Sequence, residues 1–315
     1  MGRVAVLTTG GTLAMVGDPG MGGAVPALGA QELAALLPPG APELAVEEVC
    51  NLPSSHFTLA TEWAIRERVA AWAATPGVDG VVVTHGTDTL EETAYLLDLT
   101  VAGEAAVVVT GAMRAASDLG ADGPANVWAA VRVAASPRAR GLGTLVVLNE
   151  EVHAARYVTK VDTLSPATFQ SLGRGPLGRV AGDGVHIDWR VEREVLPCAG
   201  LEERVALVKL GVGMLPHPLE DALARGARGV VLEGMGGGRI PPHWLPVIEA
   251  ALADGVAVMI ASRCPSGRVW DTYGYTGGYR SLKALGCLFS DGLNGQKARI
   301  RLMVVLGKGE RNWNR

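Results

Sequence analysis

The chain has 315 residues, enough for about two domains at roughly 150 residues each. Hydrophobic residues make up 48% of it and charged residues 19%, a composition that excludes disordered and fibrous proteins and fits a compact globular enzyme. The net charge of −4 gives no general attraction for nucleic acid, and no apolar stretch reaches the roughly 18 residues of a membrane helix.

Apolar stretches alternate with helical patterns through the first half of the chain. Each apolar stretch is a run of Val, Leu and Ala, which is typical of parallel strands covered on both faces. The sequence predicts strands at Arg3–Thr8, Leu44–Cys50, Gly80–Thr84, Ala106–Thr110 and Thr144–Leu148. It predicts helices at Ala30–Leu37, Leu59–Ala74, Thr89–Leu97 and Pro124–Ala135.

Local signals refine this half. Pro124 is typical of a first helical turn, and the pattern Thr89-Leu-Glu-Glu92 predicts a capping box. Gly182-Asp183-Gly184 predicts the turn of a hairpin over Gly178–Ile187. The Gly-rich segment Ala14–Gly29 has no periodicity and predicts a long loop, of the kind that commonly covers an active site.

A charged segment with Pro and Gly then separates a second α/β series. We therefore expect an N-terminal catalytic α/β domain at 1–188, a linker at 189–203 and a C-terminal α/β domain at 204–315. The second series predicts strands at Val205–Lys209, Gly229–Glu233 and Val256–Ser262. It predicts helices at Pro218–Arg225, Pro242–Asp254, Gly278–Leu285 and Asn294–Leu306. The expected fold class is α/β, with a larger, mainly parallel N-terminal sheet flanked by helices and a smaller C-terminal α/β domain.

Targeting and metal-binding signals are weak. The start, Met-Gly-Arg, leads at once into a strand and has no signal-peptide pattern, so we expect a cytoplasmic protein. The four cysteines form no C-x-x-C pair, which indicates reduced thiols. Glu151 and His153 lie two apart, but they fit a plain loop better than a metal site. No metal is expected.

The most informative feature is a pair of threonine-bearing turns, each at the end of a predicted strand. They are Thr8-Thr-Gly-Gly-Thr12 and Thr84-His-Gly-Thr-Asp-Thr89. Ligands of open α/β sheets bind at the carboxyl ends of strands, where the strand order reverses. A hydroxyl nucleophile needs a base and donors for an oxyanion, and the backbones at Gly11 and Gly86 can supply such donors. Taken singly, the turns also fit a Gly-rich loop and a helix cap.

Lys160 is a further candidate. The chain has 28 basic residues, of which five are lysines, and Lys160 is the only lysine before Lys209. A lysine amine is compact and can give up its proton, which arginine cannot. A solvated surface lysine is the alternative interpretation.

Together these motifs resemble the bacterial L-asparaginase family of threonine-dependent asparaginases and glutaminases. The resemblance rests on the order and spacing of the two threonine turns, of Gly111-Ala-Met-Arg114 and of Val158-Thr-Lys160. It runs from about Arg3 to Gly295-Gln-Lys-Ala-Arg299. It implies a larger N-terminal and a smaller C-terminal α/β domain, and a dimer or tetramer with active sites between subunits.

The resemblance also implies roles for single residues. Thr12 matches the family's nucleophilic threonine. Thr87, Asp88 and Lys160 match its second catalytic set, and Asp88 also matches the acid that holds the substrate's α-amino group.

Substrate binding involves a further segment, Asn51-Leu-Pro-Ser54-Ser55. Ser54 lies where the family has a serine that holds the α-carboxylate, and Ser55 replaces the glutamine that usually follows. The expected substrate-binding set is Gly11, Ser54, Ser55, Gly86, Thr87 and Asp88.

The chain departs from the family pattern at two points. The lid of most members carries a tyrosine, whereas Ala14–Gly29 has none. The glutamate that a neighbouring subunit supplies also has no clear match in the tract 268–279. That tract holds Tyr273, Tyr275 and Tyr279, and we expect one of them to replace the lid tyrosine.

The expected reaction is hydrolysis of L-asparagine to L-aspartate and ammonia, without metal or organic cofactor. We expect a homodimer or homotetramer with no nucleic-acid or membrane partner. The alternatives are a glutaminase, the amidase subunit of a tRNA-dependent amidotransferase, and a non-catalytic amino-acid-binding relative. The amidotransferase subunit carries an extra domain before its Thr-Gly-Gly-Thr motif, whereas this sequence begins at the strand. Intact Thr12, Thr87, Asp88 and Lys160 disfavour the non-catalytic relative.

Overall fold

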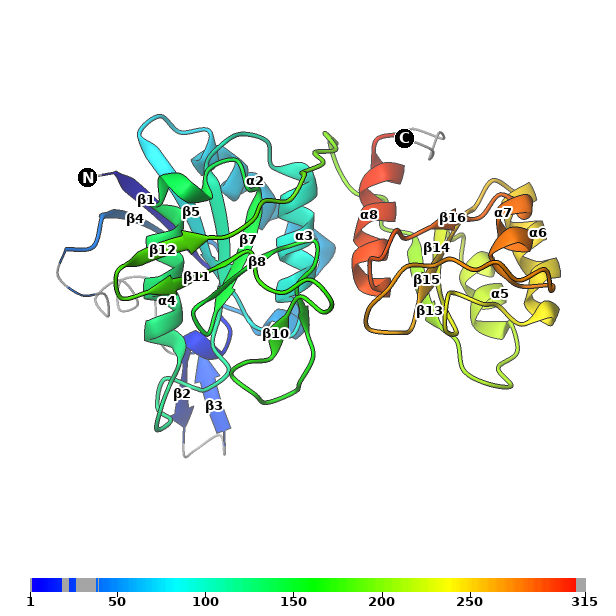
Figure 1. Cartoon of the computed structure of the whole chain (residues 1–315), viewed down its shortest axis with the longest axis horizontal. Coiled ribbons are helices and arrows are strands. Elements are labelled where there is room, and N and C mark those ends of the chain that lie inside the picture. The colour runs from blue at the N-terminus through cyan, green and yellow to red at the C-terminus, as the bar shows by residue number, and fades with distance from the viewer. Residues whose placement is uncertain (1, 19–22, 27–37, 39, 310–315) are drawn as a thin grey trace. The chain divides into compact units, whose positions relative to one another are not determined.

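The computed structural model describes residues 2–18, 23–26, 38 and 40–309, and it divides into two compact units (Figure 1). We call Met1–Pro197 unit 1 and Cys198–Arg315 unit 2. The expected helix Ala30–Leu37 lies outside the described residues, as does part of the expected loop Ala14–Gly29.

An eight-stranded sheet forms the centre of unit 1, in the order β12-β11-β8-β7-β6-β5-β1-β4. Five neighbouring strands, β4, β1, β5, β6 and β7, run parallel, and β8, β11 and β12 extend the sheet in antiparallel fashion. The strands are β1 (Arg3–Thr8), β4 (Glu43–Glu48), β5 (Val78–Thr84), β6 (Ala106–Thr110), β7 (Thr144–Leu148), β8 (Glu151–Ala154), β11 (Gly178–Ala181) and β12 (Gly184–Ile187). The five predicted strands are therefore confirmed, with ends within two residues of those expected.

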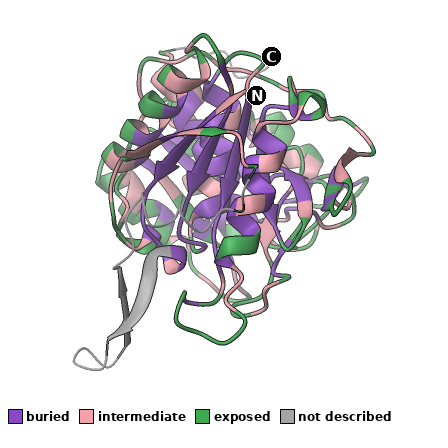
Figure 2. Cartoon of the chain, turned by 90° about the vertical axis from the view of Figure 1, so that its left-hand side faces the viewer, coloured by how far each residue is buried: buried purple, intermediate pink, exposed green. Residues whose placement is uncertain are grey.

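Side chains of the parallel strands alternate between two apolar layers, because successive residues point to opposite faces. The covering helices are α2 (Leu59–Ala73), α3 (Leu90–Thr100) and α4 (Gly123–Ala134). On β1, Val4 and Val6 pack in the layer with α4, whereas Ala5 and Leu7 pack in the layer with α2 and α3. Figure 2 shows the buried strands enclosed by helices that are exposed on their outer sides. Burial on both faces explains the continuous apolar runs.

The strand order reverses at β1. The chain runs from β1 to β4 on one side and returns to β5 on the other side. Such a reversal opens a crevice at the carboxyl ends of the two central strands. Thr8 and Thr84, the last residues of β1 and β5, pair with each other in the sheet. Both threonine turns therefore begin at this crevice.

Some local predictions were wrong. The Thr89 side chain makes no cap bond to α3, because the Glu92 N–H donates to the Thr89 carbonyl at 2.9 Å instead. The Thr89 hydroxyl donates to Ser54 O at 3.2 Å. Within Ala14–Gly29, β2 (Met15–Asp18) and β3 (Gly23–Pro26) pair as an antiparallel ribbon, not as a loop. Glu151 and His153 lie on strand β8, not in a loop.

The remaining short elements connect this framework. The hairpin predicted over Gly178–Ile187 is confirmed as β11 and β12, and Pro124 lies in the first turn of α4 as expected. The short elements are η1 (Thr12–Ala14), η2 (Ser54–His56), η3 (Pro137–Ala139), β9 (Thr159–Lys160) and β10 (Phe169–Gln170).

Unit 2 has a four-stranded parallel sheet in the order β13-β14-β15-β16. Its strands are β13 (Val205–Lys209), β14 (Gly229–Gly234), β15 (Ala257–Ser262) and β16 (Leu288–Phe289). Its helices are α5 (His217–Ala224), η4 (Pro242–Trp244), α6 (Leu245–Ala253), α7 (Tyr279–Leu285) and α8 (Gly295–Gly307). The predicted elements are confirmed, except that the helix expected from Pro242 begins as the separate turn η4.

Candidate active site

Three segments meet closely at the crevice of unit 1. Gly11 has a φ of +84°, in the region that favours glycine. A Cβ atom at Gly11 would lie 2.5 Å from the Cα and N atoms of Gly86. A Cβ atom at Gly86 would lie 2.7 Å from Ser54 Oγ. Only glycine at both positions therefore lets the loops after β1 and β5 and the turn η2 approach one another.

This packing brings the two candidate threonines onto adjoining loops. Thr12 follows Gly11 directly, begins η1 and is partly exposed. Thr87 follows Gly86 directly and is buried, with 7% of its surface exposed. The crevice thus receives one hydroxyl-bearing residue from the end of each central strand.

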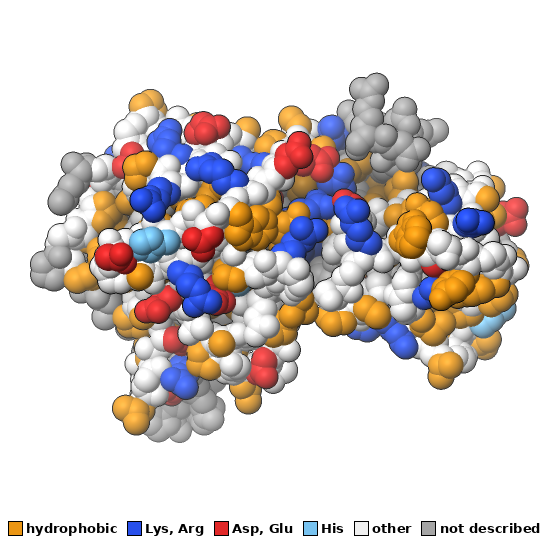
Figure 3. Space-filling model, in the orientation of Figure 1, with side chains coloured by type: hydrophobic (Ala, Val, Ile, Leu, Met, Phe, Trp, Pro, Cys, Tyr) orange, Lys and Arg blue, Asp and Glu red, His pale blue; other side chains and the backbone are white. Residues whose placement is uncertain are grey.

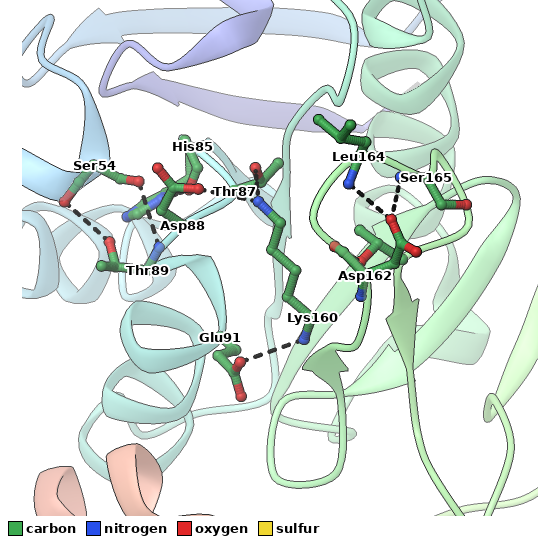
Figure 4. A network of polar contacts seen from close by, with 12 residues as sticks. Ser54, His85, Thr87, Asp88, Thr89, Glu91, Lys160, Asp162, Leu164 and Ser165 are labelled. Atoms are coloured by element: carbon green, nitrogen blue, oxygen red, sulfur yellow. Dashed lines mark hydrogen bonds and ion pairs between the residues drawn. The ribbon is translucent and has the colours of Figure 1, made fainter. Parts of the chain in front are cut away.

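Lys160 reaches this place from β9, which lies far away in the sequence. Its Nζ atom donates to Thr87 Oγ1 at 2.9 Å and to Asp88 Oδ1 at 3.0 Å (Figure 4). The Lys160 side chain is 18% exposed, whereas that of Asp88 is 65% exposed. The amine is thus largely withdrawn from solvent, while the Asp88 carboxylate remains open to a ligand.

The buried Glu91 holds the backbone of β9 in place. Its Oε1 atom accepts hydrogen bonds from Thr159 Oγ1 at 2.9 Å and from Lys160 N at 3.3 Å. Figure 4 shows Glu91 at the backbone of Lys160, while the side chain extends to Thr87 and Asp88. Glu91 was not predicted from the sequence. The sequence feature that could have indicated Glu91 is its place as an acidic residue in the helical turn that follows the Thr-Asp motif.

Ser54 lies at the N-terminus of α3. Its buried hydroxyl accepts a long hydrogen bond from Thr89 N at 3.4 Å, so its own proton stays available for donation. The N-terminus of a helix also attracts anions through its backbone N–H groups. Ser55 follows on η2 and is exposed. These features together suit a carboxylate group.

A buried polar chain, also missed from the sequence, runs behind the crevice. His85 is completely buried, with Nδ1 2.7 Å from Gly86 O and Nε2 2.8 Å from Thr93 Oγ1. Thr93 Oγ1 also lies 2.8 Å from Glu62 Oε1. Burial lowers the pKa of His85 to about 4. Burial, opposed by the Thr93 hydrogen bond and aided by the charge of Glu92, raises the pKa of Glu62 to about 8.

The three candidate tyrosines belong to unit 2. Tyr273 and Tyr275 are half-exposed and stack with their ring centroids 5.5 Å apart. Tyr279 begins α7 and packs against Phe289, with 4.5 Å between ring centroids. Their expected contribution to the active site stays a prediction.

The chemistry of the described site is that of polar protein groups. Two threonine hydroxyls, a lysine amine and an exposed carboxylate can supply a nucleophile, a proton acceptor and an anchor for a cation. In the part of the chain that the structure describes, no three His, Cys, Asp or Glu side chains gather to hold a metal ion.

An α/β fold in which a lysine meets a threonine and a carboxylate at the end of a central strand fits the class of amide-hydrolysing enzymes, and comparison with known families agrees. Residues 3–193 match the family model described as "Asparaginase, N-terminal", and residues 204–314 match the "Glutaminase/Asparaginase C-terminal domain". The chain belongs to the asparaginase family.

Curated relatives cover nearly the whole chain. An L-asparaginase of Bacillus licheniformis is 37% identical over 306 residues, which span 96% of this chain and 95% of the relative. The "Probable L-asparaginase periplasmic" of Haemophilus influenzae is 34% identical, over 96% of this chain and 88% of the relative. A glutamyl-tRNA(Gln) amidotransferase polypeptide of Methanopyrus kandleri is 33% identical, over 97% of this chain and 70% of the relative.

Proposed function

We propose that this protein hydrolyses L-asparagine to L-aspartate and ammonia. The observation that carries the proposal is the contact of Lys160 Nζ with both Thr87 and Asp88, on a loop that touches the glycine before Thr12. In the proposed reaction, the Thr12 hydroxyl attacks the side-chain amide carbon. The C–N bond breaks, ammonia leaves with a proton, and water then cleaves the Thr12 ester.

Thr87 and Lys160 are the proposed proton carriers. With a protonated amine, Lys160 donates to Thr87 Oγ1, which leaves the hydroxyl proton of Thr87 directed elsewhere. With a neutral amine, the same 2.9 Å contact lets Thr87 pass its proton to Nζ. This relay would take a proton from Thr12 or from the attacking water.

Substrate recognition is proposed to use opposite charges at the two ends of the amino acid. The exposed carboxylate of Asp88 would pair with the substrate ammonium. Ser54 and the N-terminus of α3 would hold the α-carboxylate, with Ser55 beside them. Backbone N–H groups next to Gly11 and Gly86 would stabilise the oxyanion.

Further features of the protein are proposed with this activity. We infer a cytoplasmic homodimer or homotetramer that uses no cofactor and binds neither nucleic acid nor membrane, with a linker at 189–203. In support, basic and acidic side chains are interspersed on the face of unit 1 that Figure 3 displays. No helix among the described residues is long and apolar enough to cross a membrane. The glutaminase and amidotransferase alternatives remain as outcomes of the assay.

The decisive experiment measures ammonia release from L-asparagine and from L-glutamine. We expect faster release from asparagine, and loss of nearly all turnover in Thr12→Ala, because alanine supplies no nucleophile. Thr75→Ala is the matched control, since Thr75 lies after α2 and its hydroxyl donates only to Ala71 O among the described contacts. A preference for glutamine, or Thr12→Ala turnover within tenfold of wild type, would contradict the proposal.

A further inference from the structure

The buried polar chain of Glu62, Thr93, His85 and the Gly86 carbonyl links three elements to the crevice. Glu62 comes from α2, Thr93 from α3 and His85 from the end of β5. All three side chains are at most 8% exposed. Phe57 packs edge-on against the His85 ring, with 4.9 Å between ring centroids. The chain ends on the peptide group that joins Gly86 to Thr87.

The geometry orders the protons along this chain. A carbonyl oxygen only accepts hydrogen bonds, so Nδ1 of His85 carries a hydrogen and donates to Gly86 O. In a neutral imidazole, Nε2 is then an acceptor, and Thr93 donates its single hydroxyl proton to it. Thr93 has no second proton for Glu62. If His85 is neutral, Glu62 is therefore a carboxylic acid that donates to Thr93 Oγ1, 2.8 Å away.

One other arrangement satisfies the same distances. A His85 cation could donate to Thr93, which would donate to a Glu62 carboxylate. That arrangement buries two charges separated by a hydroxyl, and burial of charges that lack direct pairing is costly. The pKa directions of both groups agree, because His85 is shifted toward its neutral form and Glu62 toward its acid form. We therefore adopt the neutral chain.

We propose that His85, Thr93 and Glu62 are positioning residues that fix the Gly86–Thr87 peptide for the reaction. A peptide group is planar, so a hydrogen bond that fixes its oxygen also fixes its N–H group and the Cα atom of Thr87. The Gly86 backbone lies against the loop that carries Thr12. The three residues touch neither the substrate nor the reacting atoms, and they act through Thr87. This inference rests on the proposed asparagine hydrolysis.

The test replaces the central hydroxyl of the chain. Thr93→Val keeps the shape of the side chain and removes the link between Glu62 and His85, whereas Thr93→Ser restores the hydroxyl. Thr100→Val is the matched control, because Thr100 is also buried on α3 and its hydroxyl donates to Leu96 O at 2.7 Å, inside the helix. The measurements are kcat and KM for ammonia release from L-asparagine, with melting temperatures.

We expect kcat of Thr93→Val to fall about tenfold below that of Thr100→Val, because small displacements of reacting groups cost rate. KM should stay within about twofold, and Thr93→Ser should keep most of the wild-type kcat. Equal kcat in the two valine variants would overturn the inference while wild-type turnover upholds the proposed function. Absence of wild-type ammonia release would overturn the proposed function itself, and the inference with it.

A second measurement does not require the valine variant to fold. Nitrogen NMR of the wild-type protein with ¹⁵N-labelled histidine reports the tautomer of each imidazole, and the His85→Gln spectrum assigns the His85 signals. We expect a neutral His85 with the proton on Nδ1 at pH 7. A cationic ring, or a proton on Nε2, would overturn the proposed chain.

Discussion

Lys160 is held at both ends. Glu91 binds its backbone N–H, and the Nζ atom spans Thr87 and Asp88. Such anchoring leaves the side chain little freedom, so the amine stays at a fixed place when a proton moves. The contacts of Nζ thus keep the amine beside Thr87 Oγ1, where the proposed proton transfer requires it.

Lys160→Arg separates a fixed charge from a proton acceptor. Arginine keeps the positive charge, yet it cannot give up its proton and presents a planar fork instead of a compact amine. We expect turnover to fall by about 10²–10⁴, the range for loss of general acid–base catalysis, with little change in melting temperature. Lys209→Arg, at an exposed lysine of β13, is the control. Near-wild-type turnover in Lys160→Arg would leave Lys160 only an electrostatic role.

The sequence could indicate the candidate residues that stand in motifs, but it could not indicate the buried polar residues that pack behind those motifs. Thr87 and Asp88 share one turn, and Lys160 stands out among few lysines, so a local pattern marks each of them. Glu62 reads as an ordinary surface residue of an α2 helix rich in charges. Only the packing of α2 against α3 buries it beside Thr93. Such partners have no sequence signal of their own.

Among the helices and strands, those buried on both faces were predicted most accurately. The parallel strands were placed well because both of their faces are apolar, which gives a continuous signal. Strand β8 was missed because it is short and follows a turn formed by Asn149 and Glu150. Both have positive φ without being glycine, so the usual turn signal is absent. The predicted capping box does not form, because the Glu92 N–H bonds to the carbonyl of Thr89 and not to its hydroxyl.

The close approach of the strand-end loops can be tested with Gly11→Ala. Gly77→Ala is its control, since the φ of Gly77 is +82° against +84° for Gly11, and no heavy atom lies within 4 Å of a Cβ there. Both variants should lose roughly 1–2 kcal/mol from left-handed backbone strain. Only Gly11→Ala should also push Gly86 away, and it should lower kcat at least about tenfold. Equal kcat in both variants would show that the contact is dispensable.

At the scale of the whole molecule, stability should depend on pH through two buried groups whose pKa values shift in opposite directions. The pKa of His85 falls from 6.5 to about 4, so its contribution is complete above pH 6.5 and is lost as pH falls through 4. The pKa of Glu62 rises from 4.5 to about 8, so its contribution is complete below pH 4.5 and is lost as pH rises through 8. Between pH 4.5 and 6.5 the two effects oppose each other.

Glu62→Gln isolates the alkaline part of this dependence. Above pH 6.5 His85 is neutral in both the folded and the unfolded protein. Of these two groups, only Glu62 then makes the unfolding free energy change with pH. The charged groups facing Glu62 are Glu92, whose charge raises the pKa of Glu62, and Cys50, whose own pKa is raised by burial first and by Glu62 second. Neither group would offset the stability lost when Glu62 ionises, because both are negative or neutral above pH 6.5. Glutamine can still donate to Thr93 and has no proton to lose.

The expected outcome is a gap between the two proteins that widens with pH. Relative to Glu62→Gln, the wild type should lose on the order of 1 kcal/mol of unfolding free energy per pH unit between pH 6.5 and 8, because the folded state holds one proton that the unfolded state has released. Urea titrations at pH 6.5, 7.25 and 8 measure this. Glu67→Gln makes the same substitution at an exposed position of α2, and its unfolding free energy should stay parallel to that of the wild type. If Glu62→Gln also stays parallel, Glu62 is ionised in the folded protein, and the neutral chain to His85 and Gly86 does not form.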